Sequence, residues 1–148
     1  MIKERLLELG YTYQPADLKT LCFNSAVRVG NLIFTSGQIP ALGEIIIKGK
    51  VGKDIDVETA KKAAEICAYK CLCAAGSVVD VELIKRAVKV TGMVNAAEGF
   101  NDTTGVINGC SEFLNKIFGE DNSHVRSAAG MTLPSDFAVE VEMIFSLE

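Results

Sequence analysis

The side chains in this sequence that can do chemistry are few, and the most unusual of them is an arginine within an apolar segment. Arg126 follows Val125 and shortly precedes Ala128, Ala129 and Met131. A guanidinium is costly to bury in such surroundings unless an anion pairs with it. One interpretation is therefore a structural ion pair with a glutamate of the same chain. The other is a fork that binds a substrate carboxylate through two parallel hydrogen bonds.

Two glutamates near the C-terminus are the candidate partners of this arginine. Glu140 and Glu142 alternate with the apolar residues Val139, Val141 and Met143, so both carboxylates point to the same face of one predicted strand. Three interpretations are open for these glutamates. They can form a solvated strand face, they can form an ion pair with Arg126, or one of them can lie beside Arg126 and orient or activate a water molecule.

Three further polar side chains, Ser36, Asn108 and His124, complete the set of candidates. The chain has one histidine and no G-x-S-x-G motif, so the usual settings of a Ser-His-Asp or Cys-His nucleophile are missing. A glycine-rich phosphate loop between a strand and a helix is missing as well. His124 lies two residues before Arg126, and we expect it near the mouth of the same site.

Composition and charge limit the class of protein. The chain has 148 residues, of which 49% are hydrophobic, as is typical of one folded domain with a generous core. Its net charge is −4 and its pI is about 5.1, and it has no run of lysines and arginines. Because binding to nucleic acid through phosphates requires a basic face, nucleic acid is an unfavoured partner.

The five cysteines point to packing and to a reducing compartment. Cys67, Cys71 and Cys73 fall on one predicted helix, where cysteine behaves as a small hydrophobic residue. A structural zinc site needs four ligands, and the single histidine is distant in the sequence, so we predict no metal site. The first ten residues lack the apolar stretch of a signal peptide, and no apolar segment is long enough to cross a bilayer. We therefore expect a cytoplasmic protein with free thiols and no membrane contact.

The elements expected to position these residues alternate between strands and helices. A Gly30-Asn31 pair between two β-rich runs predicts a hairpin, and Asp56 is a candidate N-cap for a helix with alanines and cysteines at helical spacing. The predicted helices span residues 3–9, 57–75 and 103–118, and the predicted strands span residues 22–29, 32–36, 45–47, 84–94 (broken near Gly92), 125–131 and 137–147. One sheet with two helices on one face buries both kinds of apolar surface.

Four segments, taken in order, carry a resemblance to a known family. They are residues 30–40 (GNLIFTSGQIP), Asn108 within a helical segment, residues 125–130 (VRSAAG), and Leu133-Pro134 followed by residues 139–142 (VEVE). From about Cys22 to the C-terminus, the sequence resembles the Rid/YjgF family, also labelled L-PSP endoribonuclease-like, in a longer RidA-like branch. We therefore expect an N-terminal extension with a short helix over residues 1–20 and a YjgF/Rid-like domain over residues 21–148.

The resemblance implies an α+β fold with a chorismate-mutase-like or YjgF-like mixed β-sheet, two helices packed on one face, and a homotrimer with active sites in clefts between subunits. It also implies hydrolytic deamination of reactive enamine and imine intermediates, such as 2-aminoacrylate and 2-iminopropanoate, to a 2-oxo acid and ammonia. An imine carbon is already electrophilic, so the reaction needs a positioned water but no metal, cofactor or covalent nucleophile.

The same resemblance assigns roles to individual residues. Arg126 matches the carboxylate-binding arginine of the family, and Glu140 matches the acidic residue that positions the attacking water. Ser36 and Asn108 match polar residues that line the substrate site.

The sequence departs from the family pattern at two further substrate-binding positions. Phe23 stands where many members have a tyrosine, and Ala128 stands where they often have a cysteine. The segment from Arg126 to Leu133 is also one residue shorter than usual. These departures leave the carboxylate clamp in place and bear on the range of substrates.

Two other functions are compatible with these residues. A trimer can bind small 2-oxo acids in the same clefts without turnover, which would make it a non-catalytic binding protein. An endoribonuclease of the L-PSP type is the third possibility, although the acidic pI and the lack of a His/Lys acid–base pair argue against it.

Overall fold

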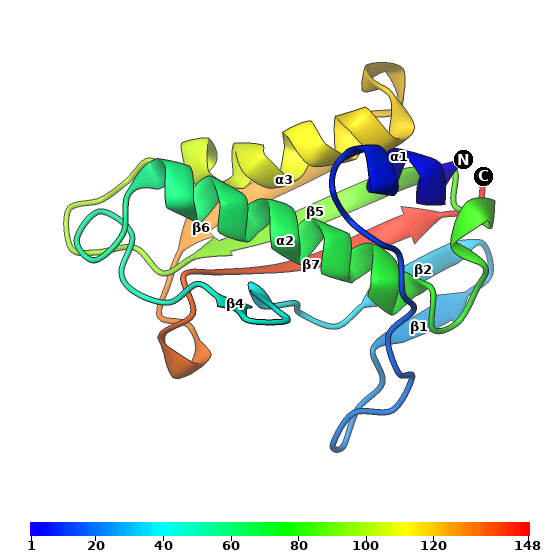
Figure 1. The fold of residues 1–148 in the computed structure, drawn as a ribbon, viewed down its shortest axis with the longest axis horizontal. Helices are drawn as coiled ribbons and strands as arrows, with labels where there is room; N and C mark the ends of the chain where they lie inside the picture. The colour runs from blue at the N-terminus through cyan, green and yellow to red at the C-terminus, as the bar shows by residue number, and fades with distance from the viewer.

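A five-stranded mixed sheet with two long helices on one face forms the body of the chain in the computed structural model, which describes residues 1–148 (Figure 1). The strands lie in the order β1 (Ala26–Val29), β2 (Leu32–Thr35), β7 (Val139–Ser146), β5 (Arg86–Val94) and β6 (Val125–Gly130). Neighbouring strands are antiparallel except β5 and β6, which are parallel. The predicted α+β fold is confirmed, and β1 and β6 are the edge strands of the sheet.

Helices α2 (Val57–Ala75) and α3 (Thr103–Phe118) lie side by side over the sheet (Figure 1). Each helix follows an aspartate whose side chain accepts a hydrogen bond from the backbone N–H three residues later, at 2.8 Å for Asp56 and 3.0 Å for Asp102. The predicted N-cap at Asp56 is therefore confirmed. Both predicted helices have the observed bounds because capping and apolar periodicity act locally.

Small side chains let these helices lie close to each other and to the sheet. A Cβ at Gly109 of α3 would lie 2.1 Å from the carbonyl oxygen of Lys61 on α2, so only glycine fits there. On the sheet side of α2, the sulfur atoms of Cys67 and Cys71 lie 3.9 and 3.4 Å from carbonyl oxygens of β7. Both cysteines are fully buried and free, and their predicted packing role is confirmed.

Strand β5 differs from its prediction because it continues through Gly92 without a break. A Cβ at this position would lie 2.6 Å from Cγ1 of Ile107 on α3. The glycine therefore provides space for a helix to pack against the strand, and it does not end the strand.

The predicted hairpin at Gly30-Asn31 joins β1 to β2, but β1 begins only at Ala26. The residues before it form a separate loop that is closed by a bridge between Lys19 and Asn24 and projects from the body (Figure 1). Leu21 within this loop is fully exposed. Residues 22–25, which the sequence pattern predicts as strand, therefore belong to this loop.

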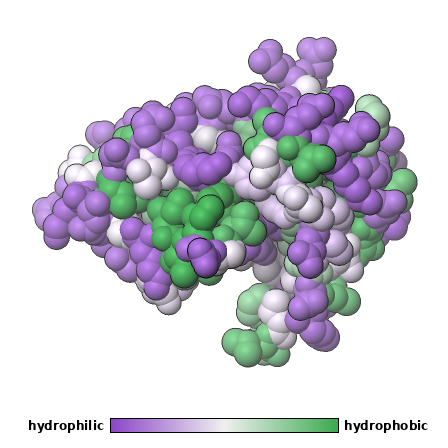
Figure 2. All heavy atoms as spheres, in the orientation of Figure 1, coloured by the Kyte–Doolittle hydropathy of each residue, from purple (hydrophilic) through white to green (hydrophobic).

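A second, smaller hairpin consists of β3 (Ala41–Leu42) and β4 (Ile45–Ile46). Figure 2 shows an apolar patch over this hairpin on an otherwise largely hydrophilic face, and Ile45 and Ile46 are both exposed. The short strand expected around residues 45–47 is therefore present, paired within its own hairpin and separate from the main sheet.

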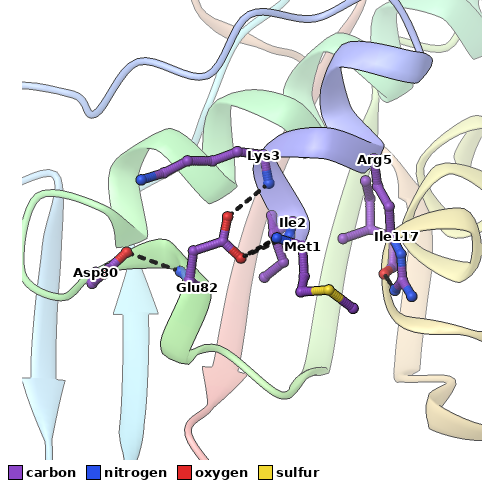
Figure 3. A network of polar contacts seen from close by, with 7 residues as sticks. All are labelled: Met1, Ile2, Lys3, Arg5, Asp80, Glu82 and Ile117. Carbon is purple, nitrogen blue, oxygen red and sulfur yellow. Dashed lines mark hydrogen bonds and ion pairs between the residues drawn. The ribbon is translucent and has the colours of Figure 1, made fainter.

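Helix α1 (Ile2–Glu8) is held on the body by apolar and polar contacts (Figure 3). Ile2 is buried, and the carboxylate of Glu82 accepts hydrogen bonds from the backbone N–H groups of Ile2 (2.8 Å) and Lys3 (3.0 Å). Burial raises the pKa of Glu82, but these hydrogen bonds and the N-terminal ammonium outweigh burial and lower the pKa to about 2. The Arg5 guanidinium also donates to a carbonyl in the last turn of α3.

The face of the sheet opposite the helices is uncovered in the single chain. The register of β1 and β2 places Val27 beside Phe34 and Val29 beside Leu32, and all four side chains are exposed on this face. Val125 of β6 lies on the same face and is 63% exposed. Exposed apolar side chains gathered on two neighbouring strands, as on β1 and β2, are typical of a protein–protein interface.

Candidate functional site

Arg126 lies on edge strand β6 and points toward the helix side of the sheet. Its strand register places it beside Val90 and, one strand further, Met143, both of which are buried beneath the helices. Its Nη1 donates to the Oγ of Ser111 at 3.0 Å, and its Nη2 donates to the carbonyl oxygen of Thr104 at 3.4 Å. None of the three ion pairs in the chain includes this partly buried guanidinium.

The partners of Arg126 come from one polar stripe on α3. Thr104, Asn108 and Ser111 are spaced at i, i+4 and i+7, which places them on the same side of the helix. The hydroxyl of Thr103 donates to the backbone carbonyl of Ala128 on β6 (3.1 Å), which fixes the stripe against this strand. The structure thus brings Arg126, Asn108, Ala128 and Ser111 to one edge of the sheet, and we call these four the arginine group.

Glu140 and Glu142 share one face of β7, as predicted, but this is the face opposite the arginine. They alternate with residues buried under the helices, and β5 lies between their strand and β6. The interpretation of Arg126 as half of a structural ion pair with a glutamate of its own chain is therefore wrong, and within one chain Glu140 does not lie beside Arg126. Alternation along one strand does not reveal which face a neighbouring strand presents.

Glu140 lies against Gly37, and Gly37 lines a cavity at the end of β2, away from edge strand β6 that carries Arg126. A Cβ at Gly37 would lie 3.0 Å from Cδ of Glu140, so the glycine leaves room for the carboxylate. Burial, and then the charge of Glu142, raise the pKa of Glu140. A carboxylate with a raised pKa exchanges a proton more readily near neutral pH, as a general acid or base requires.

Ser36 and Phe23 line this cavity, which has a volume of about 350 Å³ and is completed by the loop that precedes β1. The Ser36 hydroxyl donates to the carbonyl oxygen of Asn24 at 2.6 Å, and the Phe23 ring is about half exposed. Together with Gly37 and Glu140, these residues form a second cluster, which we call the glutamate group. The two groups belong to different parts of the sheet, and a single chain does not unite them.

Ser111 and His124 lie beside Arg126, but the sequence patterns gave neither residue a defined role at this site. Ser111 was not a candidate, although its spacing from Asn108 on one helix side is a signal that was available. The Oγ of Ser111 lies 2.8 Å from Nε2 of His124, the only histidine. Burial, and then the charge of Arg126, lower the pKa of His124, which favours the neutral imidazole.

Neither a metal cluster nor a membrane span accompanies these groups. No three His, Cys, Asp or Glu side chains come close enough together to hold a metal ion. No helix has the length and apolar character needed to span a bilayer.

Comparisons with known proteins identify the family. Residues 18–146 match the family described as Endoribonuclease L-PSP, and the chain therefore belongs to this family, which is also called YjgF/Rid. The resemblance inferred from the four sequence segments is confirmed. Among curated proteins, Protein TCP17 of Trypanosoma cruzi is 30% identical over 151 residues, covering 99% of this chain and 94% of that protein.

Two solved structures match nearly the whole chain. One is Atu1372 from Agrobacterium tumefaciens, a protein of unknown function, with 34% identity, a TM-score of 0.89, and coverage of 99% of this chain and 93% of that one. The other is a candidate endoribonuclease from Shewanella oneidensis MR-1, with 23% identity, a TM-score of 0.88, and coverage of 99% of both chains. Because 99% of this chain is matched in both cases, the matched part includes α1.

Proposed function

We propose that this protein hydrolyses reactive enamine and imine intermediates, such as 2-aminoacrylate and 2-iminopropanoate, to a 2-oxo acid and ammonia. The observation that supports this most is the partly buried Arg126, which has hydrogen-bond partners but no anionic partner in its own chain. An uncompensated charge in such a position is unfavourable, and a ligand carboxylate would compensate it through two parallel hydrogen bonds.

The separation of the two groups supports a site between subunits. Arg126 belongs to edge strand β6, whereas Ser36 follows β2 near the other edge of the sheet. The uncovered sheet face carries exposed apolar side chains on β1, β2 and β6, with polar side chains such as Thr91 and Glu142 on the strands between them. A second copy packed against this face would bury the apolar surface and could bring its own glutamate group to the arginine group. The homotrimer that the family resemblance implies is the assembly we propose.

In this arrangement the two groups divide the reaction between them. Arg126 binds the substrate carboxylate, and Ser36, Asn108, Phe23 and Ala128 line the pocket around it. Water adds to the carbon of the protonated imine while Glu140 takes one proton from the water, which gives a neutral carbinolamine. Glu140 returns this proton to the nitrogen, the C–N bond breaks to release ammonia, and the hydroxyl proton passes back to Glu140 as the C=O bond of the 2-oxo acid forms. Positioning of reactants alone can supply several kcal/mol, up to about 7–11 kcal/mol in ideal cases.

The test uses imines generated in situ by an amino-acid oxidase, with their disappearance followed in the presence of wild-type protein, Arg126→Ala or buffer. We expect wild type to accelerate hydrolysis and Arg126→Ala to approach the buffer rate. Equal rates for wild type and Arg126→Ala would reject the proposal. A 2-oxo acid that binds wild type but not Arg126→Ala, with no acceleration by either protein, would favour the non-catalytic binder instead.

A ribonuclease is the second candidate because the matched family carries that description. The negative net charge and the single histidine do not favour it. RNA cleavage that co-purifies with wild type and is lost in Arg126→Ala would support this candidate, whereas cleavage that persists in Arg126→Ala would indicate a contaminant.

A further inference from the structure

We infer that Ser111 and His124 are positioning residues for Arg126: the serine hydroxyl fixes the guanidinium, and the imidazole fixes the hydroxyl. The inference deepens the proposed function, since it assumes that Arg126 binds the substrate carboxylate. It assigns a role to two side chains that contact neither Glu140 nor the cavity beside it.

The hydrogen bonds of this chain of three residues have a defined direction. An arginine can only donate, so the Ser111 Oγ accepts from Nη1 of Arg126 at 3.0 Å. The hydroxyl then has its own hydrogen available, and Nε2 of His124 lies 2.8 Å away. A neutral imidazole with its proton on Nδ1 accepts that hydrogen at Nε2. The serine is thereby held from both sides.

Ser111 makes the better of the two contacts that hold the guanidinium. The other contact, from Nη2 to the Thr104 carbonyl, is 3.4 Å long, beyond the usual range for N–H···O hydrogen bonds. Without the serine hydroxyl, Arg126 would keep only this weak contact, and its flexible side chain would sample more rotamers. Binding a carboxylate would then require the side chain to be ordered again.

The surroundings of His124 make it responsive to Arg126. His124 immediately precedes β6 and lies two residues before Arg126, so both side chains point to the same side in extended backbone. The other charged residues on the elements packed around it are Glu112 and Lys116 on α3, Glu120 and Asp121 in the short 3-10 turn η2 (Glu120–Asn122), and Arg86 and Lys89 on β5. None of these side chains is hydrogen-bonded to the imidazole, and the three carboxylates are exposed.

Protonation of His124 would disturb this arrangement. A charged imidazole donates from Nε2, so the serine would face two donors and two cations would share one hydroxyl. Low pH is therefore expected to release the hydroxyl from its present orientation. A carboxylate bound to Arg126 would offset the extra positive charge and favour the protonated imidazole.

The experiment measures the titration of His124 by NMR of ¹³C-labelled imidazole, which needs no assignment because the chain has one histidine. The proteins are wild type, Ser111→Ala, Ser111→Thr, Arg126→Gln and the Ser111→Ala/Arg126→Gln pair. Ser77→Ala serves as the matched control, because Ser77 also loses a hydroxyl hydrogen bond, to the Ala74 carbonyl at the end of α2 (2.6 Å), far from Arg126. Each protein is titrated alone and with 2-oxobutanoate.

In the absence of ligand, we expect Arg126→Gln to raise the midpoint of the His124 titration when Ser111 is present. The same substitution should have a smaller effect in the Ser111→Ala background. Ser77→Ala should match wild type. If Arg126→Gln leaves the midpoint unchanged, or changes it equally with and without Ser111, the inference is overturned. This part of the experiment needs no catalysis and no ligand binding, so it stands even if the proposed function fails.

In the titrations with 2-oxobutanoate, we expect the ligand to raise the midpoint of the His124 titration in wild type and in Ser111→Thr, and to have little effect in Ser111→Ala. The imine assay tests the same variants by their kinetics. We expect KM of Ser111→Ala to rise about tenfold, the loss of one hydrogen bond to a charged group, with a smaller change in kcat. Ser111→Thr should restore most of the affinity because it keeps the hydroxyl. A Ser111→Ala protein with the KM and pH profile of Ser77→Ala would overturn the inference.

Discussion

The arginine group and the glutamate group act on their central charged residues in different ways. An arginine carries a permanent charge in proteins, so its surroundings can only orient it. Arg126 is oriented by the two hydrogen bonds that it donates to α3. Glu140 lies against Gly37, and burial and a neighbouring carboxylate raise its pKa. A permanent cation therefore needs fixed geometry, whereas a carboxylate can be tuned by solvation. A binding residue and a proton carrier are expected to differ in this way.

The largest effect is expected when the arginine group loses its charge. Arg126→Ala should lower kcat/KM for imine hydrolysis by about 10²–10⁴-fold, since two charge-assisted hydrogen bonds are each worth about 1.5–3 kcal/mol. Arg126→Lys should recover part of this loss because it keeps the charge but not the fork. Steady-state kinetics on oxidase-generated imines check both variants. Equal activities for the lysine and alanine variants would show that charge is not what the residue contributes.

The glutamate group should respond in kcat more than in KM. Glu140→Gln is expected to lower kcat by about 10²-fold or more, the usual contribution of a general acid–base group, with KM changed far less. The measurement is a full substrate-concentration series at several pH values. A variant with raised KM and unchanged kcat would make Glu140 a binding residue and remove the division of roles between the two groups.

A smaller effect is expected when only the tuning of Glu140 changes. After burial, the charge of Glu142 raises the pKa of Glu140, so Glu142→Gln should lower that pKa and move the acidic limb of the kcat–pH profile to lower pH. Activity at neutral pH should change little. A shift of the limb toward higher pH would contradict the assigned cause.

The smallest effect on catalysis is expected from a residue outside both groups. Glu82→Gln removes the acceptor that holds the first turn of α1 and should destabilise the fold by about 1–2 kcal/mol at neutral pH. The folded-state pKa of Glu82, about 2, lies below its ordinary value of 4.5, so this stability is present above pH 4.5 and is lost as pH falls toward 2. Thermal unfolding across this range, with exposed Glu4→Gln as control, measures the difference. If the difference in stability between Glu82→Gln and wild type stays constant down to pH 2, the lowered pKa of Glu82 would be contradicted.

Much of the architecture was predictable because its signals are local. The Asp56 cap, the Gly30-Asn31 turn and the apolar stripe of α3 each act within a few residues, and the elements they predict are present. Gly92 and the segment before Ala26 were misread because their roles depend on what packs against them. A glycine that makes room for a packed helix cannot be distinguished in the sequence from a glycine that ends a strand.

By itself the sequence determined the set of candidate side chains, their order on strands and helices, and the family to which the chain belongs. Only the tertiary structure decided how they combine. Alternation fixes the face of a side chain relative to its own strand, but the register across β6, β5 and β7 decides whether two strands present their polar residues to the same side. That register places Arg126 under α3 with Ser111 and His124, and it places Glu140 on the far face of the sheet, beyond reach within one chain.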